Sequence, residues 1–144
     1  MSLNPATELT YKHRLALEHL ERAERLYALG DWVGAVSACQ LSVESFAKAV
    51  IAVFEVPTWS HDPSDQLHGL LGRIPAHSVD DVKKLADTAR EMAAEHGRSS
   101  YGEPSAGILP SDIYREDHAS DSLERARKAR KTTDEVLRQL NNRV

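Results

Sequence analysis

The sequence predicts an all-α protein, an up-and-down four-helix bundle with an additional short helix. Apolar residues recur at helical spacing over several long stretches, some of these stretches are separated by very short joints, and no strand-like alternation of useful length occurs. The chain has 144 residues, of which 41% are hydrophobic and 28% charged. These proportions are typical of a globular protein, and the length predicts one domain over residues 1–144.

Residues 31–54 are the most apolar run and are predicted to form the central helix. The main apolar stripe recurs every three or four residues: Trp32, Val36, Cys39, Val43, Phe46, Val50 and Val53. A second stripe rich in alanine makes the helix apolar on most sides, so we expect neighbours around it. Asp31 is expected to be its N-cap. Glu44 and Lys48 are expected to pair along one edge or to lie at a subunit interface.

A first helix is predicted at residues 6–29, with Thr7 as its cap. Gly30 is a natural left-handed C-cap, and so short a joint before the central helix predicts an antiparallel hairpin. The last helix is predicted at residues 116–140, with a charged outer face.

Between the central and last helices, two further helices are predicted at residues 64–73 and 78–96. Ser78 and Asp81 resemble a capping box for the longer of the two, and Gly97 is expected to end it. Residues 98–113 contain turn formers and two prolines, so they are expected to be irregular. Long loops are often functional, which makes this segment the expected location of chemistry.

The charge and cysteine content restrict the class of protein. The formal net charge is -4, so the chain has no overall excess of basic residues that would indicate nucleic-acid binding. A local basic patch could still bind nucleic acid. The single cysteine, Cys39, lies on the apolar stripe and is expected to be a buried hydrophobic residue. Neither a signal pattern nor a membrane span is evident, so we expect a cytoplasmic protein with no membrane partner.

Three segments in this order resemble the HEPN domain (higher eukaryotes and prokaryotes nucleotide-binding), especially its small stand-alone prokaryotic members. The hairpin ALEHLERAERLYALGDWVGAVSACQLSVESFAKAVIAVF resembles the opening of the family, and LHGLLGRI at 67–74 resembles a later His-containing turn. The third segment, HGRSSYGEPSAGILPSDIYREDHASDSLERARKA, resembles the late Arg–Tyr stretch, proline-bearing loop and closing helix.

The resemblance implies a helical bundle that commonly forms a homodimer. Many members are RNases in toxin–antitoxin or defence systems and use an Arg followed, after four to six residues, by a His. Others work with a small nucleotidyltransferase partner, and some bind nucleotides without cleaving them. Fold-level analogy does not decide among these activities.

Arg90 and His96 match the Arg–His spacing of the family and adjoin the 98–113 segment. In RNA cleavage His96 would transfer a proton and Arg90 would stabilise charge on the phosphate. On a regular helix the two side chains point about 120° apart, so they converge only if the helix ends earlier or a second subunit completes the site. The alternative interpretation pairs Arg90 with Asp87 and places His96 at the helix C-terminus.

Arg98 and Tyr101 match the late Arg–Tyr portion of the family and are the candidate nucleotide-binding residues. Arg98 could hold a phosphate and Tyr101 could stack on a base. Equally, Tyr101 could fix the loop to the bundle through its ring and hydroxyl.

The remaining polar motifs favour ordinary structural roles. Seven histidines are present, but no two of them stand at i and i+4 with an acidic residue as companion, so we expect no metal and no cofactor. The basic run at 125–131 is interspersed with acidic residues and is expected to be a solvated helix face.

Three functional hypotheses follow. The leading one is a dimeric module that binds a nucleotide, RNA or a nucleotidyltransferase partner. The second is a metal-independent RNase that uses Arg90 and His96 across the dimer. The third is a purely structural interaction module.

Overall fold

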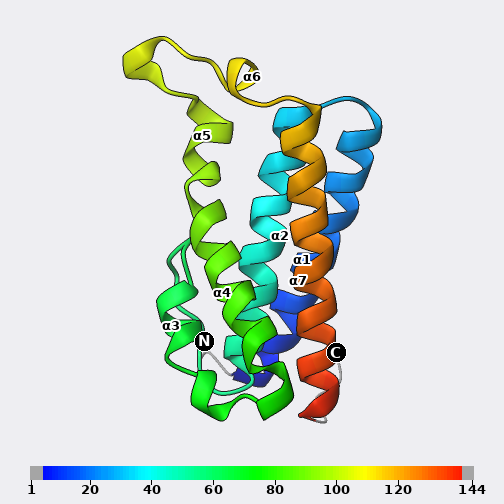
Figure 1. Ribbon diagram of the computed structural model, residues 1–144, viewed down its shortest axis with the longest axis vertical. Helices are drawn as coiled ribbons and strands as arrows, with labels where there is room; N and C mark the ends of the chain where they lie inside the picture. Colours follow the sequence, from blue (N-terminus) through cyan, green and yellow to red (C-terminus); the bar gives the residue numbers. More distant parts are fainter. Residues whose placement is uncertain (1–4, 141–144) are drawn as a thin grey trace.

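The computed structural model describes residues 5–140 and shows an all-α bundle. Four long antiparallel helices, one of them extended by a short continuation, form the bundle (Figure 1). They are α1 (Pro5–Ala28), α2 (Trp32–Ala52), α4 (Val79–Ala93) continued by α5 (Glu95–Tyr101), and α7 (Glu116–Gln139). The short α3 (Ser64–His68) packs against α4, and α6 (Pro110–Ile113) precedes α7. Among the described residues no strand forms, so the predicted fold class is confirmed.

Helix α2 is the core helix, and it contacts α1, α3, α4, α5, α6 and α7. Its length and composition would also suit a membrane span, but 89% of that apolar stretch is buried inside the protein. Burial among neighbouring helices accounts for its apolar surface, as expected for the central helix of a bundle. Phe46, Val43 and Val50 are fully buried there.

The α1–α2 hairpin forms as predicted. Gly30 has a φ of 76°, and Asp31 accepts a hydrogen bond from the Gly34 N–H at 2.8 Å, which caps α2. Thr7, however, is not the cap of α1, because the helix already includes Pro5. A proline is well tolerated in the first turn of a helix, where its missing N–H has no intrahelical partner.

Cys39 is completely buried, as predicted. Burial raises the pKa of its thiol to about 12, so the reactive thiolate is scarcely populated at neutral pH.

The middle of the chain differs from the sequence prediction. Helix α3 ends at His68, and residues 71–73 and 76–78 form separate 3₁₀ turns. Ser78 makes no capping hydrogen bond to the backbone; its hydroxyl instead donates to Gln139 Oε1 at 2.8 Å. The predicted capping box is therefore wrong, because the Ser78 hydroxyl is hydrogen-bonded to Gln139 on α7 and not to the backbone of α4.

Residues 98–113 are also more ordered than predicted. Gly97 does not end a helix but lies inside α5, which packs against α2. The break comes earlier, at Ala94. After α5 the chain makes an isolated antiparallel bridge between Glu103 and Ile108, then crosses one end of the bundle to α7 (Figure 1).

Truncation of the core and of the surface should have very different effects. We expect Phe46→Ala to reduce the free energy of unfolding by about 3 to 5 kcal/mol, because it leaves a cavity in a close-packed core. Leu29 is 80% exposed, so Leu29→Ala should change it by no more than about 0.5 kcal/mol. Urea unfolding followed by circular dichroism measures both, and equal losses would contradict the assignment of α2 as the core.

Candidate functional site: a buried polar cluster on helix α2

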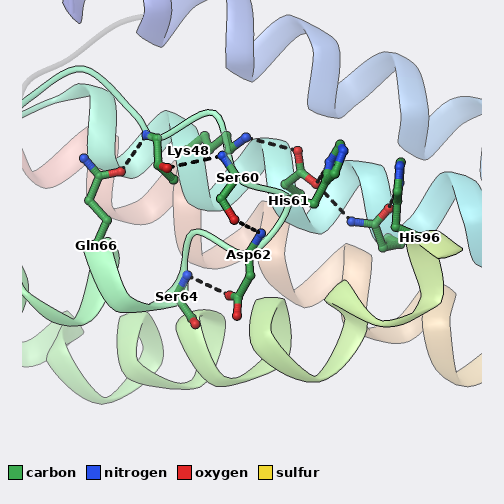
Figure 2. A network of polar contacts seen from close by, with 10 residues as sticks. Lys48, Ser60, His61, Asp62, Ser64, Gln66 and His96 are labelled. Atoms are coloured by element: carbon green, nitrogen blue, oxygen red, sulfur yellow. Dashed lines mark hydrogen bonds and ion pairs between the residues drawn. The ribbon is translucent and has the colours of Figure 1, made fainter.

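Three polar side chains lie one turn apart on the otherwise apolar helix α2. Glu44 Oε1 accepts a hydrogen bond from Gln40 Nε2 at 3.0 Å, and Glu44 Oε2 accepts one from Lys48 Nζ at 3.2 Å (Figure 2). Glu44 is 8% exposed and Lys48 is 4% exposed. Buried charges are costly unless they are paired and hydrogen-bonded, so this face of α2 is a specialised polar site.

Two histidines from other segments complete this group. His61 Nδ1 lies 3.0 Å from Glu44 Oε1, and His96 Nδ1 lies 3.3 Å from Gln40 Oε1. The two imidazole rings stack with centroids 3.8 Å apart and an interplanar angle of 24° (Figure 2). We call Gln40, Glu44, Lys48, His61 and His96 the polar cluster.

The hydrogen bonds of the polar cluster define the tautomers of both rings. A carboxylate only accepts hydrogen bonds, so the amide nitrogen of Gln40 faces Glu44 and its oxygen faces His96. Both histidines therefore carry hydrogen on Nδ1, and in its neutral form each ring keeps a lone pair on Nε2. Such a lone pair can accept a proton, which is the role of a general base.

A third histidine, His19 on α1, is electrostatically coupled to Glu44. Burial lowers the pKa of His19 below its usual value, and the charge of Arg22 acts in the same direction. Glu18 and Glu44 oppose this effect. His19 is therefore neutral at pH 7 and adds no positive charge beside the cluster.

The segment that carries His61 is held by a regular series of hydrogen bonds. The Thr58 N–H donates to Gln66 Oε1 at 2.7 Å, and the N–H groups of Ser60, Asp62 and Ser64 each donate to the side chain two residues earlier (Figure 2). Such local side-chain to backbone bonds replace the missing helix or sheet pairing. These hydrogen bonds stabilise the observed conformation of the loop between α2 and α3.

Arg90 reaches the same loop from α4. Its Nε donates to Ser64 Oγ at 3.0 Å, and its Nη2 forms an ion pair with Asp65. The alternative pairing with Asp87 is wrong, because Asp87 binds His68 at 3.1 Å. Both of these contacts of Arg90 are with the first two residues of α3.

Arg90 and His96 therefore meet the same short segment from two sides. Helix α4 ends at Ala93, but Ala94 keeps helical dihedral angles, so α5 continues the path of α4 with Arg90 on one helix and His96 on the other. Their contacts go to different partners, however: Arg90 to residues 64–65, and His96 to His61 and Gln40. Arg90 and His96 are therefore connected indirectly, because both contact the segment 61–65.

The other predicted pair, Arg98 and Tyr101, lies further along α5. Arg98 has carboxylates on two sides, Glu95 at 3.5 Å and Glu103 at 3.3 Å, which offset its charge. Tyr101 is 75% exposed, so it does not fix the loop to the bundle.

Tyr114 is the residue that anchors this region. It is buried, and its hydroxyl donates to Glu95. Burial, followed by this hydrogen bond, raises the pKa of the phenol well above its usual value. It therefore stays protonated and keeps donating at physiological pH.

A pocket of 220 Å³ adjoins the polar cluster. It is lined by α1, α2 and the loop between α2 and α3: Glu8, Lys12, Glu44, Lys48, Val56, Pro57, Thr58, Trp59 and His61. The sequence analysis missed it, although the spacing of Gln40, Glu44 and Lys48 on an apolar helix was a signal for a buried polar site.

Elsewhere the charged residues behave as predicted. In the run 125–131, Arg125, Arg127, Lys128 and Arg130 each form an ion pair with a carboxylate, which is consistent with a solvated mixed-charge face. Within residues 5–140, no three His, Cys, Asp or Glu side chains gather as a metal site requires.

The comparisons with known proteins identify the family. A model of the HEPN domain matches residues 12–141, which is nearly the whole chain. Searches of curated proteins and of solved structures gave no match. The match covers the α1–α2 hairpin, the polar cluster and the closing helix together, and the chain belongs to the HEPN domain family.

Proposed function

We propose that this protein is a nucleotide- or RNA-binding module that holds a phosphate group against Lys48, at the edge of the polar cluster. HEPN domains are nucleotide- and RNA-related modules, often found in toxin–antitoxin and defence systems. The single observation that carries the proposal is the position of Lys48: its side chain is 5% exposed and yet lines an open pocket.

The hydrogen-bonding capacity of Lys48 supports this proposal. A lysine ammonium has three N–H donors, and Glu44 is its partner in the part of the chain that the structure describes. A phosphate oxygen in the pocket would accept from the remaining donors through charge-assisted hydrogen bonds. Lys12, on the opposite side of the pocket, would add a second positive charge.

A second candidate, metal-independent RNA cleavage, is favoured by the stacked imidazoles of His61 and His96. Cleavage by the ribose 2′-hydroxyl needs one group to accept a proton and another to donate one. In this hypothesis His96 exchanges the proton, and Arg90 positions the segment that carries His61. A second subunit that supplies a further Arg90 is the arrangement in which Arg90 would contact the phosphate.

The roles of Arg98 and Tyr101 remain predictions within this proposal. Tyr101 is free to stack on a base, whereas Arg98 would have to leave Glu95 or Glu103 to hold a phosphate. We further propose a cytoplasmic homodimer that works with a small nucleotidyltransferase in a toxin–antitoxin or defence setting. A purely structural interaction module is the outcome if neither nucleotide nor RNA binds.

Removing the charge of Lys48 should weaken RNA binding. We expect Lys48→Met to reduce the affinity for a short fluorescein-labelled single-stranded RNA at least tenfold, because a hydrogen bond to a charged group contributes about 1.5–3 kcal/mol. Fluorescence anisotropy measures the affinity. Lys128→Met removes the same charge from an exposed ion pair and is the matched control. Equal affinities of the two variants would contradict the proposal.

Growth of the expression host should separate binding from cleavage. For cleavage, overexpression of the wild-type protein should arrest growth, and His96→Ala should relieve the arrest while His77→Ala, at an exposed site, does not. For binding alone, His96→Ala and Arg90→Ala should leave growth unchanged. Arrest that persists in His96→Ala would exclude the acid–base role of this histidine.

The homodimer is open to a direct measurement. The α1–α2 joint and the segment after α5 lie at the same end of the bundle (Figure 1). Leu29 at the joint, Leu109 in that segment and Tyr101 at the end of α5 are exposed, and contiguous apolar surface marks interaction sites. Light scattering after gel filtration should give twice the 16.0 kDa chain mass. A monomer at micromolar concentration would contradict the proposal.

A further inference from the structure

Trp59 is the most exposed large hydrophobic side chain that the structure describes. It is 86% exposed at the entrance to the pocket beside the polar cluster. The other tryptophan, Trp32, is partly buried and packs on Tyr27 with ring centroids 5.3 Å apart. An indole open to water next to a polar pocket has a free face on which a planar ligand can stack.

The backbone beside Trp59 is held by hydrogen bonds on both sides. Pro57 is buried, the Thr58 N–H is bound to Gln66, and the Ser60 N–H donates to Thr58 Oγ1 at 3.2 Å. Gln66 in turn donates to Glu55 and to the carbonyl of Val56. A ligand that stacks on Trp59 would therefore pay little ordering entropy in the loop.

We propose that Trp59 forms a stacking subsite for one unpaired nucleobase of single-stranded RNA, with the adjoining backbone phosphate held by Lys12 and Lys48. This inference rests on the proposed function and specifies its substrate class. Aromatic side chains beside a positively charged groove are the usual means of holding single-stranded nucleic acid, because every base has a π face.

The charge of the pocket favours an internal phosphate over a terminal one. The lining contains two lysines and two glutamates, which offset one another, together with His61. The single negative charge of a phosphodiester is the smaller charge to place in so balanced a lining. A terminal phosphate carries about 1.5 to 2 negative charges at pH 7 and is less well matched.

The exposed indole also favours single strands over duplexes. In an A-form duplex the faces of the bases are covered by their neighbours, so stacking on a protein side chain requires an unpaired base. A pocket of 220 Å³ has room for part of one nucleotide and none for a duplex.

Binding measurements on Trp59 variants test this subsite. We expect Trp59→Ala to weaken binding of a short mixed-sequence single-stranded RNA about tenfold, and Trp59→Phe to keep most of the affinity because it retains a ring. Trp32→Phe changes the other tryptophan, which packs on Tyr27 and does not line the pocket, and should have no effect. In a Trp32→Phe background, where Trp59 is the remaining tryptophan, the RNA should quench the fluorescence.

The choice of probes separates failure of the subsite from failure of the proposed function. Duplex RNA, a 5′-mononucleotide and an abasic strand of equal length should all bind more weakly than the single strand. If the wild-type protein binds RNA but Trp59→Ala or the abasic strand binds equally well, the subsite is overturned and the proposed function stands. If the wild-type protein binds no RNA, both are overturned.

Discussion

The ion pair between Glu44 and Lys48 is the constraint on which the rest of the site depends, because it lies within the most buried helix. Two charges in that environment must be paired and hydrogen-bonded, and Gln40 and His61 supply the additional bonds to Glu44. A neighbouring helix with an apolar face could not supply these hydrogen bonds to Glu44. The loop between α2 and α3 therefore covers this part of α2, and its side chains close the site while leaving a pocket open to water.

The same constraint gives the Arg–His spacing a structural interpretation. Arg90 is bound to Ser64 and Asp65 at the start of α3, directly after the loop that brings His61 to Glu44. His96 then stacks on the other side of that histidine. The two residues therefore contact one short segment from two helices.

The fold was largely predictable from the sequence, whereas the site was only partly so. Local signals determine the α1–α2 hairpin: the apolar stripes, the left-handed Gly30 and the Asp31 cap all act within a few residues. Helix α5 was missed because glycine and serine are weak helix formers, and packing against α2 overrides that preference. The stack of His61 on His96 joins two segments through tertiary packing, and no spacing in the sequence encodes such a contact.

The stacked histidines also restrict what the site can do. Each ring is held at Nδ1 by a partner on α2, His61 by Glu44 and His96 by Gln40, so Nε2 is the nitrogen left for a ligand. In the proposed function such a nitrogen would accept a proton from a ribose hydroxyl while Lys48 holds the adjoining phosphate. Binding and cleavage are therefore not opposed in this geometry. What separates them is whether a ribose 2′-hydroxyl can reach the free Nε2 of one ring while its phosphate is held at Lys48.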